Sequence, residues 1–354
     1  MHVGLNFLPT AAPDRTPAAG LYAEWLELCA EADLLGFAHV KVVEHHLHPW
    51  GGYSPDPVAL LSAVAARTRT VRLVTGAVVP AFTHPVKLAA SLSLLDNLSG
   101  GRLDAGFGRA FLPTEFDAFG IAMEESRGRL VEGVEAVTRL WSEHGFRFEG
   151  PFHRFGPLPE LLPRTAQRPH PPVFIAATTA PETFTWAGRE GHHLMVIPSV
   201  VGHDRLALLL DAYRQARREA GHTTPGRLHL SVHAHLDEDR ARALDSAEQH
   251  YEEYRAYQLD AYASWRGTTS DAYPGYEKME EAARAVRFED LLEAGHLIAG
   301  DPSDAVDALR ATAVRYPGAE ISLHLRYGEI THREAQRSLR LLGAKVLPEL
   351  AELP

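Results

Sequence analysis

The sequence predicts an α/β fold in which eight parallel strands and their helices close into a (β/α)₈ barrel. Three observations support this prediction. Short apolar runs typical of strands alternate with helical patterns along nearly the whole chain, which implies a parallel sheet with right-handed crossovers. Eight such repeats fit a closed barrel better than an open sheet. No linker or low-complexity tract divides the chain, so we expect a single domain over residues 1–354.

In the first half of the chain, each predicted strand is a short apolar run that precedes a helical pattern. Gly36 ends the first helix, and a Ser-Gly-Gly sequence ends the third. The predicted strands cover residues 3–7, 39–43, 71–79 and 103–108, and the helices cover residues 22–35, 57–67, 85–98 and 123–141.

The second half continues the alternation around two longer segments. Residues 145–172, after the fourth strand, are rich in proline and aromatic residues and predict an irregular insertion. Residues 239–295, after the seventh strand, are mostly helical in pattern, and we interpret them as a helical lid. The remaining predicted strands cover residues 173–178, 194–198, 228–236 and 321–325, and the helices cover residues 181–191, 203–220 and 333–350.

The composition argues against several classes of partner. The formal net charge of −11 disfavours binding to nucleic acid or to an anionic membrane surface. No apolar run approaches the roughly 18 residues that span a bilayer, and the residues after Met1 lack a signal-peptide pattern, so we expect a cytoplasmic protein. The single cysteine, Cys29, argues against a disulfide framework and a cysteine-rich metal site.

The second predicted strand ends in Glu44-His45-His46. Barrel enzymes place their active site at the C-terminal ends of the strands, so these side chains are expected at the mouth of the barrel. A histidine side chain of ordinary pKa, about 6.5, can donate or accept a proton at physiological pH. The alternative is a pair of surface histidines, because the chain contains 20 of them.

Small residues follow the third and fourth strands. Gly76 and Ala77 would let a flat ring approach the backbone, although tight barrel packing explains them equally well. Gly106 and Gly108 allow close backbone approach, and Arg109 supplies a cation. This is not a dinucleotide-binding fingerprint, because a phenylalanine replaces the third glycine of that motif.

The end of the fifth strand indicates an anion site. Small and hydroxyl side chains come just before a helix that begins at Pro181, and helix N-termini bind phosphate through free N–H groups and the helix dipole. An ordinary N-cap would explain one threonine but not the cluster. The cluster consists of Ala177, Thr178, Thr179 and Thr183.

Polar residues recur at every second position of the seventh and eighth strands. Because the helix-facing side of a barrel strand should be apolar, we expect these side chains to face inward and form a polar lumen that binds a polar ligand. An internal hydrogen-bond network is the alternative. The positions are His229, Ser231, His233 and His235 in the seventh strand, and Ser322, His324 and Arg326 in the eighth.

The order of these motifs resembles the luciferase-like monooxygenases, the flavin-dependent family that includes bacterial luciferase. Each motif alone is weak, but the ordered set is specific to the family and extends from Met1 to about Gly191, with a weak continuation at residues 299–302. The motifs are Glu44-His45-His46, Ser54-Pro55-Asp56-Pro57, Thr75-Gly76-Ala77-Val78-Val79, Thr83-His84-Pro85-Val86-Lys87, Leu94-Leu95-Asp96-Asn97-Leu98-Ser99-Gly100-Gly101-Arg102, Gly106-Phe107-Gly108-Arg109, Met123-Glu124-Glu125-Ser126-Arg127 and Ala187-Gly188-Arg189-Glu190-Gly191.

The resemblance implies an enzyme that uses reduced FMN, supplied by a separate NAD(P)H:flavin reductase, together with dioxygen. Oxygen would add at the flavin C4a atom, and the resulting peroxyflavin would oxygenate a small organic substrate, for example an intermediate of secondary metabolism. The resemblance also implies a homodimer.

The resemblance further assigns residues to roles by their positions. His45 matches the catalytic histidine, which would transfer a proton or stabilise the peroxyflavin, and Glu44 would orient the loop or the ring. Gly76-Ala77 matches a bulge, often a non-prolyl cis peptide, under the isoalloxazine ring. The phosphate would be held by Arg109, Phe111 and Arg127 on one wall and by Thr178, Thr179 and Thr183, next to Ala177, on the other.

The predicted substrate pocket departs from that of luciferase. Gly108 stands where luciferase has a reactive cysteine, so the pocket must have a different shape and the protein need not emit light. The pocket residues are His46, Gly108, His233, His235 and His324. The segment 239–295 matches the mobile loop of the family only in place, and a surface helix pair is the alternative to a lid.

Three other functions remain open at this point. A relative of the same fold uses the deazaflavin F420 for hydride transfer, and the phosphate wall would serve either cofactor. The sequence His233-x-His235 resembles a zinc-hydrolase pair, but such barrel enzymes carry theirs on the first strand, so we expect no metal site. A non-catalytic flavin-binding paralogue is the third alternative, and the presence of His45, Arg109 and Arg127 argues against it.

Overall fold

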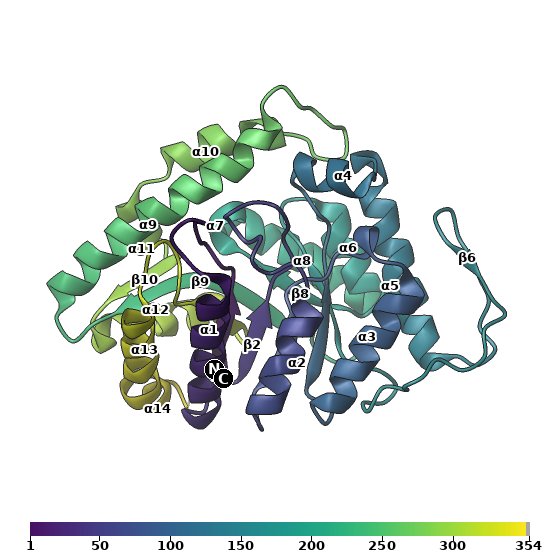
Figure 1. Cartoon of the computed structure of the whole chain (residues 1–354), viewed down its shortest axis with the longest axis horizontal. Helices are drawn as coiled ribbons and strands as arrows, with labels where there is room; N and C mark the ends of the chain where they lie inside the picture. Colours follow the sequence, from purple (N-terminus) through teal and green to yellow (C-terminus); the bar gives the residue numbers. More distant parts are fainter. Residues whose placement is uncertain (352–354) are drawn as a thin grey trace.

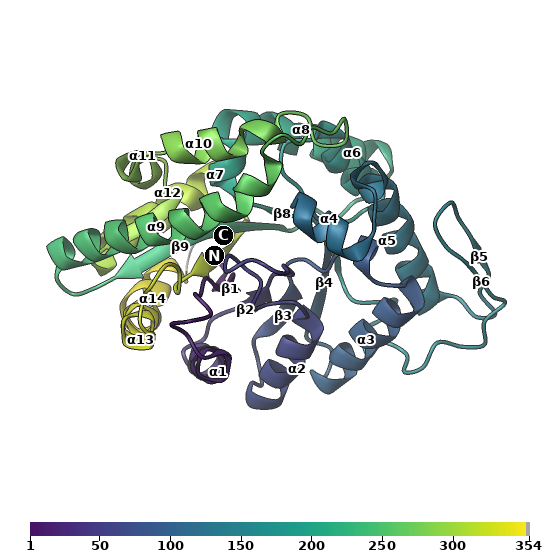
Figure 2. The same cartoon turned by 45° about the horizontal axis from the view of Figure 1, so that its top comes forward.

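The computed structural model describes residues 1–351, in which eight parallel strands form a closed barrel surrounded by helices (Figures 1 and 2). Neighbouring strands pair in parallel from one to the next, and β8 pairs with β9 to complete the ring, with Met195 opposite His229. The predicted fold class is therefore confirmed. The barrel strands are β1 (Val3–Phe7), β2 (His39–Val42), β3 (Arg72–Thr75), β4 (Leu103–Phe107), β7 (Val173–Ala176), β8 (His193–Val196), β9 (Leu228–Leu236) and β11 (Glu320–His324).

Strand β9 is longer than its neighbours and carries an additional strand at its far end. Its first residues pair with β8, and residues from His233 onward pair on the same edge with β10 (Leu297–Gly300). β10 was not predicted from the sequence. Its four residues come directly after a helical segment, and so short a run shows no alternation of apolar and polar residues.

The helices cover the outside of the barrel, and α2 and α3 match their predicted bounds residue for residue. Asp56 caps α2 by accepting a hydrogen bond from the Ala59 N–H at 3.0 Å, and Thr331 and Glu334 form a capping box on α13. Within residues 1–351, no helix is long and apolar enough to cross a membrane. The outer helices are α1 (Ala18–Leu34), α2 (Pro57–Arg67), α3 (Pro85–Leu98), α5 (Ser126–Ser142), α6 (Pro181–Arg189), α8 (His203–Glu219), α12 (Pro302–Arg315) and α13 (His332–Leu341).

Three predictions about individual elements were wrong. The third strand is shorter than predicted, because the chain turns at the cis peptide Gly76-Ala77 directly after β3. The helix predicted over residues 333–350 is interrupted by a π-turn at Leu342–Val346 before α14 (Leu347–Leu350). Three helices were missed. They are α4 (Pro113–Phe119) and α7 (Pro198–Val201), which are two turns or shorter, and α12, although Asp301 and Asp304 form a capping box that the sequence indicates.

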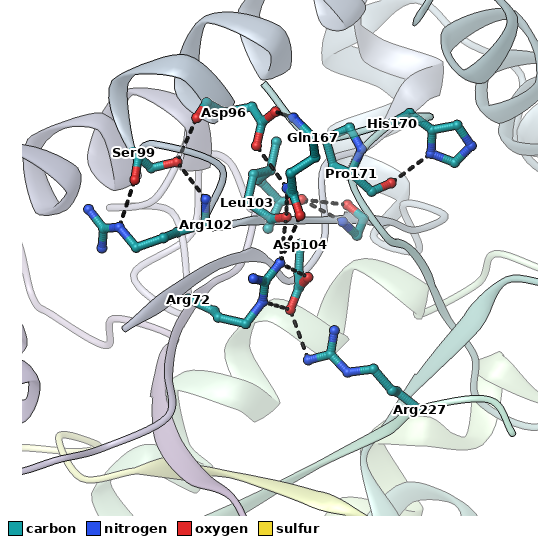
Figure 3. A network of polar contacts seen from close by, with 12 residues as sticks. Arg72, Asp96, Ser99, Arg102, Leu103, Asp104, Gln167, His170, Pro171 and Arg227 are labelled. Carbon is teal, nitrogen blue, oxygen red and sulfur yellow. Dashed lines mark hydrogen bonds and ion pairs between the residues drawn. The ribbon is translucent and has the colours of Figure 1, made fainter. Parts of the chain in front are cut away.

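The insertion after the fourth barrel strand is an arm that projects from the body (Figures 1 and 2). It carries a short antiparallel hairpin of β5 (Phe148–Glu149) and β6 (Arg154–Phe155), so it is not wholly irregular. The arm is anchored where it returns to the barrel (Figure 3). There the Gln167 side chain donates to Asp96 at 2.8 Å and to the Leu103 carbonyl at 2.7 Å.

An ion-pair network lies at the amino-terminal ends of the strands (Figure 3). Arg72 and Arg227 both donate to the fully buried carboxylate of Asp104, at 2.9 and 3.0 Å. Arg227 also donates to both oxygens of Glu320, at 2.6 and 3.0 Å. Burial raises the pKa of Glu320, but its contacts with His229 and Arg227 outweigh burial and hold the pKa well below its usual range. These charges are mutually paired, which indicates a structural role for this end of the barrel.

The lumen is polar, as the alternating pattern of the seventh strand predicted. Ser231 accepts a hydrogen bond from Lys41 across the barrel, and His39 Nε2 lies 2.7 Å from Ser322 Oγ. The rings of His39 and His229 are 4.5 Å apart. The inward direction of these β9 and β11 side chains is confirmed, whereas Arg326, just beyond β11, forms an ion pair with Glu24 on α1 instead.

Candidate active site

The loop after β2 brings the predicted catalytic histidine to the carboxyl-terminal mouth of the barrel. Ser54 closes this loop, because its hydroxyl donates to the Val43 carbonyl at 2.6 Å and its carbonyl accepts from the His45 N–H at 3.2 Å. The His45 ring lies 4.9 Å from Trp50 and meets Phe111 edge-on at 5.6 Å. Its side chain is 14% exposed, so the ring is enclosed but still accessible from one side.

Glu115 holds the His45 ring. It lies on α4, a helix that was not predicted from the sequence. His45 Nδ1 lies 3.1 Å from Glu115 Oε1, and the same oxygen accepts from the His46 N–H at 2.8 Å. Burial raises the pKa of Glu115, but the His45 ring and these hydrogen bonds outweigh it and lower the pKa overall. The sequence did contain a signal for the start of this helix. A proline followed two residues later by an acidic residue, as at Pro113 and Glu115, is typical of a first helical turn.

Glu44 connects the β2 loop to the β3 loop. Its Oε2 atom accepts from the Val79 N–H at 2.9 Å, and its Oε1 atom lies 3.2 Å from His46 Nε2. Burial raises the pKa of Glu44. Glu44 thus orients the loop, whereas the contact with the His45 ring comes from Glu115.

Small side chains from three strand ends pack together as a floor at the mouth of the barrel. The peptide Gly76-Ala77 is cis, as the resemblance implied. A Cβ atom added at Gly108 would lie 3.1 Å from the Ala77 Cβ and 3.3 Å from the Ala176 Cβ, so these three residues already pack closely. The floor Ala77–Gly108–Ala176 has no side chain larger than a methyl group and can accept a flat ring.

Two arginines and several hydroxyl groups gather at one edge of this mouth. Arg109 donates to the buried Ser126 hydroxyl at 2.9 Å, and Arg127 donates to the Thr183 hydroxyl at 3.4 Å. Burial lowers the pKa of Arg127, and the nearby Arg109 lowers it further while Glu182 partly opposes the shift. Two guanidinium groups this close together have the chemistry that suits an anion.

The remaining predicted wall residues lie beside these arginines. Ala177 is buried, the Thr178 hydroxyl lies 3.2 Å from the Tyr276 hydroxyl, and the Thr179 carbonyl accepts from Arg205 at 2.8 Å. The hydrogen bond from Arg127 to Thr183 therefore joins the two predicted phosphate walls, whereas Phe111, also predicted there, packs against His45.

Part of the segment predicted as a lid lies directly over the mouth. The whole segment contains α9 (Arg240–Tyr262), α10 (Met279–Ala285) and α11 (Phe288–Glu293). The chain between α9 and α10 passes next to α4 (Figures 1 and 2). There the Ala272 carbonyl accepts from Arg109 at 2.8 Å, the Tyr273 ring lies 4.2 Å from the Arg109 guanidinium, and the Tyr273 hydroxyl donates to the Ala110 carbonyl. This segment thus contacts the same groups that would bind an anion.

The predicted substrate-pocket residues do not all come together. The His46 ring meets the stacked rings of Phe82 and Phe119 edge-on, and Gly108 forms part of the floor. His233 and His324 lie deeper, with their rings 4.9 Å apart, and neither Nε2 atom has a hydrogen-bond partner among residues 1–351. Burial lowers the pKa of both histidines.

His235 lies apart from this group, because β9 continues past the barrel at that point. Its ring is 6.2 Å from His250 on α9, and its electrostatic neighbours include Glu334 on α13. The His233 ring instead contacts Tyr254 and Tyr327 as well as His324, so the two histidines have different neighbours.

Another cluster of potential metal ligands, His39, His229 and Glu320, lies at the opposite end of the barrel. Their ligand atoms lie within 4.8 Å of one another. However, Arg227 donates to both oxygens of Glu320, and the amine of Lys41 lies in the same lumen. These neighbouring cationic side chains disfavour a metal ion there.

Comparisons with known proteins agree with this geometry. A model of the luciferase-like monooxygenase family matches residues 1–320. The crystal structure of the monooxygenase RslO1 from Streptomyces bottropensis is 42% identical, with a TM-score of 0.86 over 98% of this chain and 99% of that one. The oxygenase component of the flavin-dependent trigonelline monooxygenase of Acinetobacter baylyi is 27% identical over 96% of this chain and 92% of its own length. An uncharacterised protein of Sinorhizobium fredii is 36% identical over 52% of this chain, and the matched stretch covers 53% of that protein.

More distant solved structures share the fold alone. The oxygenating constituent of 3,6-diketocamphane monooxygenase from Pseudomonas putida, in complex with FMN, has a TM-score of 0.79 at 20% identity, over 98% of each chain. The coenzyme F420-dependent tetrahydromethanopterin reductase of Methanopyrus kandleri has a TM-score of 0.70 at 18% identity, also over 98% of each chain. The fold is therefore shared by proteins that use FMN and by proteins that use F420.

Proposed function

The chain belongs to the luciferase-like monooxygenase family, and from this premise we propose that it is the oxygenase component of a two-component system that uses reduced FMN and dioxygen to oxygenate a small organic substrate. One observation carries the proposal. The same barrel mouth holds the His45 ring, the small-residue floor and the pair Arg109 and Arg127. A proton-transfer group, a flat surface and an anion site are the three features that a flavin monooxygenase needs.

The residues present fit FMN. The isoalloxazine ring would lie against the floor Ala77–Gly108–Ala176, and the phosphate would be held by Arg109 and Arg127 with the hydroxyl groups of Thr178 and Thr183. When bound, reduced FMN supplies the electrons that activate dioxygen. His45 would exchange a proton at Nε2, because its Nδ1 atom faces Glu115.

The test combines binding with oxygen chemistry. Purified protein is titrated anaerobically with reduced FMN and with reduced F420, and each complex is then mixed with dioxygen in a stopped-flow spectrometer. The proposal expects tight FMNH₂ binding and a transient C4a-peroxyflavin spectrum. Preference for F420 with no oxygen consumption would instead support the hydride-transfer alternative.

The substrate is sought by a screen with ¹⁸O₂. The first compound tested is trigonelline, for which one relative is named, and other small organic compounds follow. Incorporation of one labelled oxygen atom, detected by mass spectrometry, identifies a substrate. A separate NAD(P)H:flavin reductase, a homodimeric assembly and a cytoplasmic location stay predictions, which co-purification, light scattering and cell fractionation test.

Arg109→Ala is expected to weaken FMN binding about 10- to 100-fold, because a charged hydrogen-bond partner of a phosphate is lost. His45→Ala should have a smaller effect on affinity, since its ring is assigned to the chemistry rather than to the phosphate. Quenching of FMN fluorescence measures both dissociation constants.

Arg129→Ala is the matched control for Arg109→Ala. Arg129 is a nearby arginine on α5, but it pairs with Glu125 and stacks on Phe152 at 4.7 Å, away from the floor. Its loss removes the same formal charge and should leave FMN affinity unchanged. Equal losses of affinity for Arg109→Ala and His45→Ala would contradict the assigned division of roles.

A further inference from the structure

We infer that Glu115 is a positioning residue for His45, which it holds with Nδ1 turned toward α4 and Nε2 left for the reacting groups. The inference rests on the proposed function in one respect, that His45 acts on the chemistry. The contact itself is independent of that assumption. It joins two elements 70 positions apart in the sequence.

The hydrogen-bond chemistry of the pair sets the tautomer of the His45 ring. An ionised carboxylate can only accept hydrogen bonds, so His45 Nδ1, 3.1 Å from Glu115 Oε1, must carry the hydrogen. In the neutral ring the lone pair is then on Nε2, and that nitrogen can accept a proton. Without Glu115 both tautomers become available, and the ring presents the wrong nitrogen for part of the time.

Packing restricts the His45 ring to the same orientation. Trp50 and Phe111 border it, and Gly51 lies so close that an added Cβ would be 2.8 Å from the Cβ of His45. Gly51 has a φ of +85°, a conformation that glycine adopts readily. These neighbours limit where the ring can lie, and Glu115 determines which nitrogen faces inward.

Glu115 is itself held firmly. It is 1% exposed, and the adjacent Phe116 is equally buried, in a cluster with Val79 and Tyr273. The neighbouring Thr114 lies 2.7 Å from His48 Nε2, which connects α4 to the β2 loop a second time. The carboxylate therefore does not need to move to meet the ring.

The chain contains a second pair of the same kind outside the mouth. His153 Nδ1 lies 2.8 Å from Glu132 Oε1, and Glu132 also accepts from the Phe152 N–H at 3.0 Å. Glu132 is buried on α5, facing the arm. Removing its carboxylate disrupts a buried Glu–His pair without touching His45, which makes Glu132→Ala the matched control.

The first readout is the ring of His45 itself. Protein with ¹⁵N-labelled histidine is examined by NMR, and the signal missing in His45→Asn identifies the residue. We expect the Nδ1–H tautomer in the wild type and in Glu132→Ala, and a mixture of tautomers in Glu115→Ala. The Nε2–H tautomer in the wild type, or no change in Glu115→Ala, would overturn the inference.

The second readout is kinetic. Glu115→Ala is expected to reduce substrate turnover about 100-fold, Glu115→Gln to retain part of it because the amide oxygen can still accept, and Glu132→Ala to have little effect. The double variant Glu115→Ala/His45→Asn should turn over no more slowly than His45→Asn alone, since Glu115 acts through that ring. Additive losses in the double variant would overturn the inference.

The two readouts separate failure of this inference from failure of the proposed function. If the wild type neither binds FMNH₂ nor consumes oxygen, the proposed function fails, and the NMR experiment still decides whether Glu115 sets the tautomer. If Glu115→Ala does not fold, Glu115→Leu supplies the same comparisons with a larger side chain that also has no hydrogen-bond acceptor.

Discussion

Replacing His45 with asparagine is expected to leave the fold and the binding of reduced FMN intact while turnover falls by about 100- to 10,000-fold. The ring is enclosed and able to exchange a proton, and its Nδ1 atom is engaged by Glu115. Asparagine can still donate to Glu115 through its amide, so the buried carboxylate keeps a hydrogen-bond partner. The loss therefore reports on proton exchange and not on misfolding.

The measurement compares turnover of the substrate found by the ¹⁸O₂ screen with FMNH₂ affinity in the same preparations. His153→Asn is the matched control, because His153 is similarly enclosed and also contacts a buried glutamate, Glu132, but lies outside the mouth. We expect near-normal turnover in that variant. If His45→Asn turned over substrate as fast as the wild type, His45 would have no role in catalysis.

The sequence was sufficient to predict the barrel and the end of it that carries the site. The ends of the strands can be located in the sequence because each apolar run stops at polar, charged or glycine residues. In a parallel barrel the C-terminal ends of all strands lie at the same mouth. For that reason alone, residues that follow three different strands could be assigned to one site. They are Glu44 and His45, Gly76, and Arg109.

Contacts between distant segments could not be predicted in this way. Glu115 lies on a helix of two turns, too short to show a clear period, and its partner His45 is brought to it by the barrel and not by local sequence. Likewise, Tyr273 was assigned to a lid, but nothing in the sequence indicated that its ring would lie on Arg109. His235 was grouped with His233 by period alone, and the departure of β9 from the barrel separated them.

Several buried histidines lead to a prediction about the whole molecule, that acid unfolds it at an unusually mild pH. Burial lowers the pKa of several histidines, so the folded protein holds them neutral. The pKa falls to about 4 for His193, His235 and His324, and to about 3 for His192. In the unfolded chain each would have its ordinary pKa near about 6.5.

The sign of the effect follows from proton binding. Between these pKa values the unfolded state binds more protons than the folded state, so stability is complete above about pH 6.5 and falls as the pH is lowered toward 4. From pH 6 to pH 5, three such histidines together cost about 3 to 4 kcal/mol, out of a total stability of about 5 to 15 kcal/mol. Asp33, whose pKa is lowered to about 2 by hydrogen bonds that outweigh its partial burial, adds to the loss only at still lower pH.

Urea unfolding at pH 7.5, 6 and 5 measures this loss. His235→Gln should reduce the slope of unfolding free energy against pH by up to about 1.4 kcal/mol per pH unit, because one proton is no longer taken up on unfolding. His144→Gln is the matched control, since that side chain is 72% exposed in the folded state and so is in contact with water before and after unfolding. If the free energy of unfolding were the same at pH 7.5 and pH 5, these histidines would be charged in the folded protein and the prediction would be wrong.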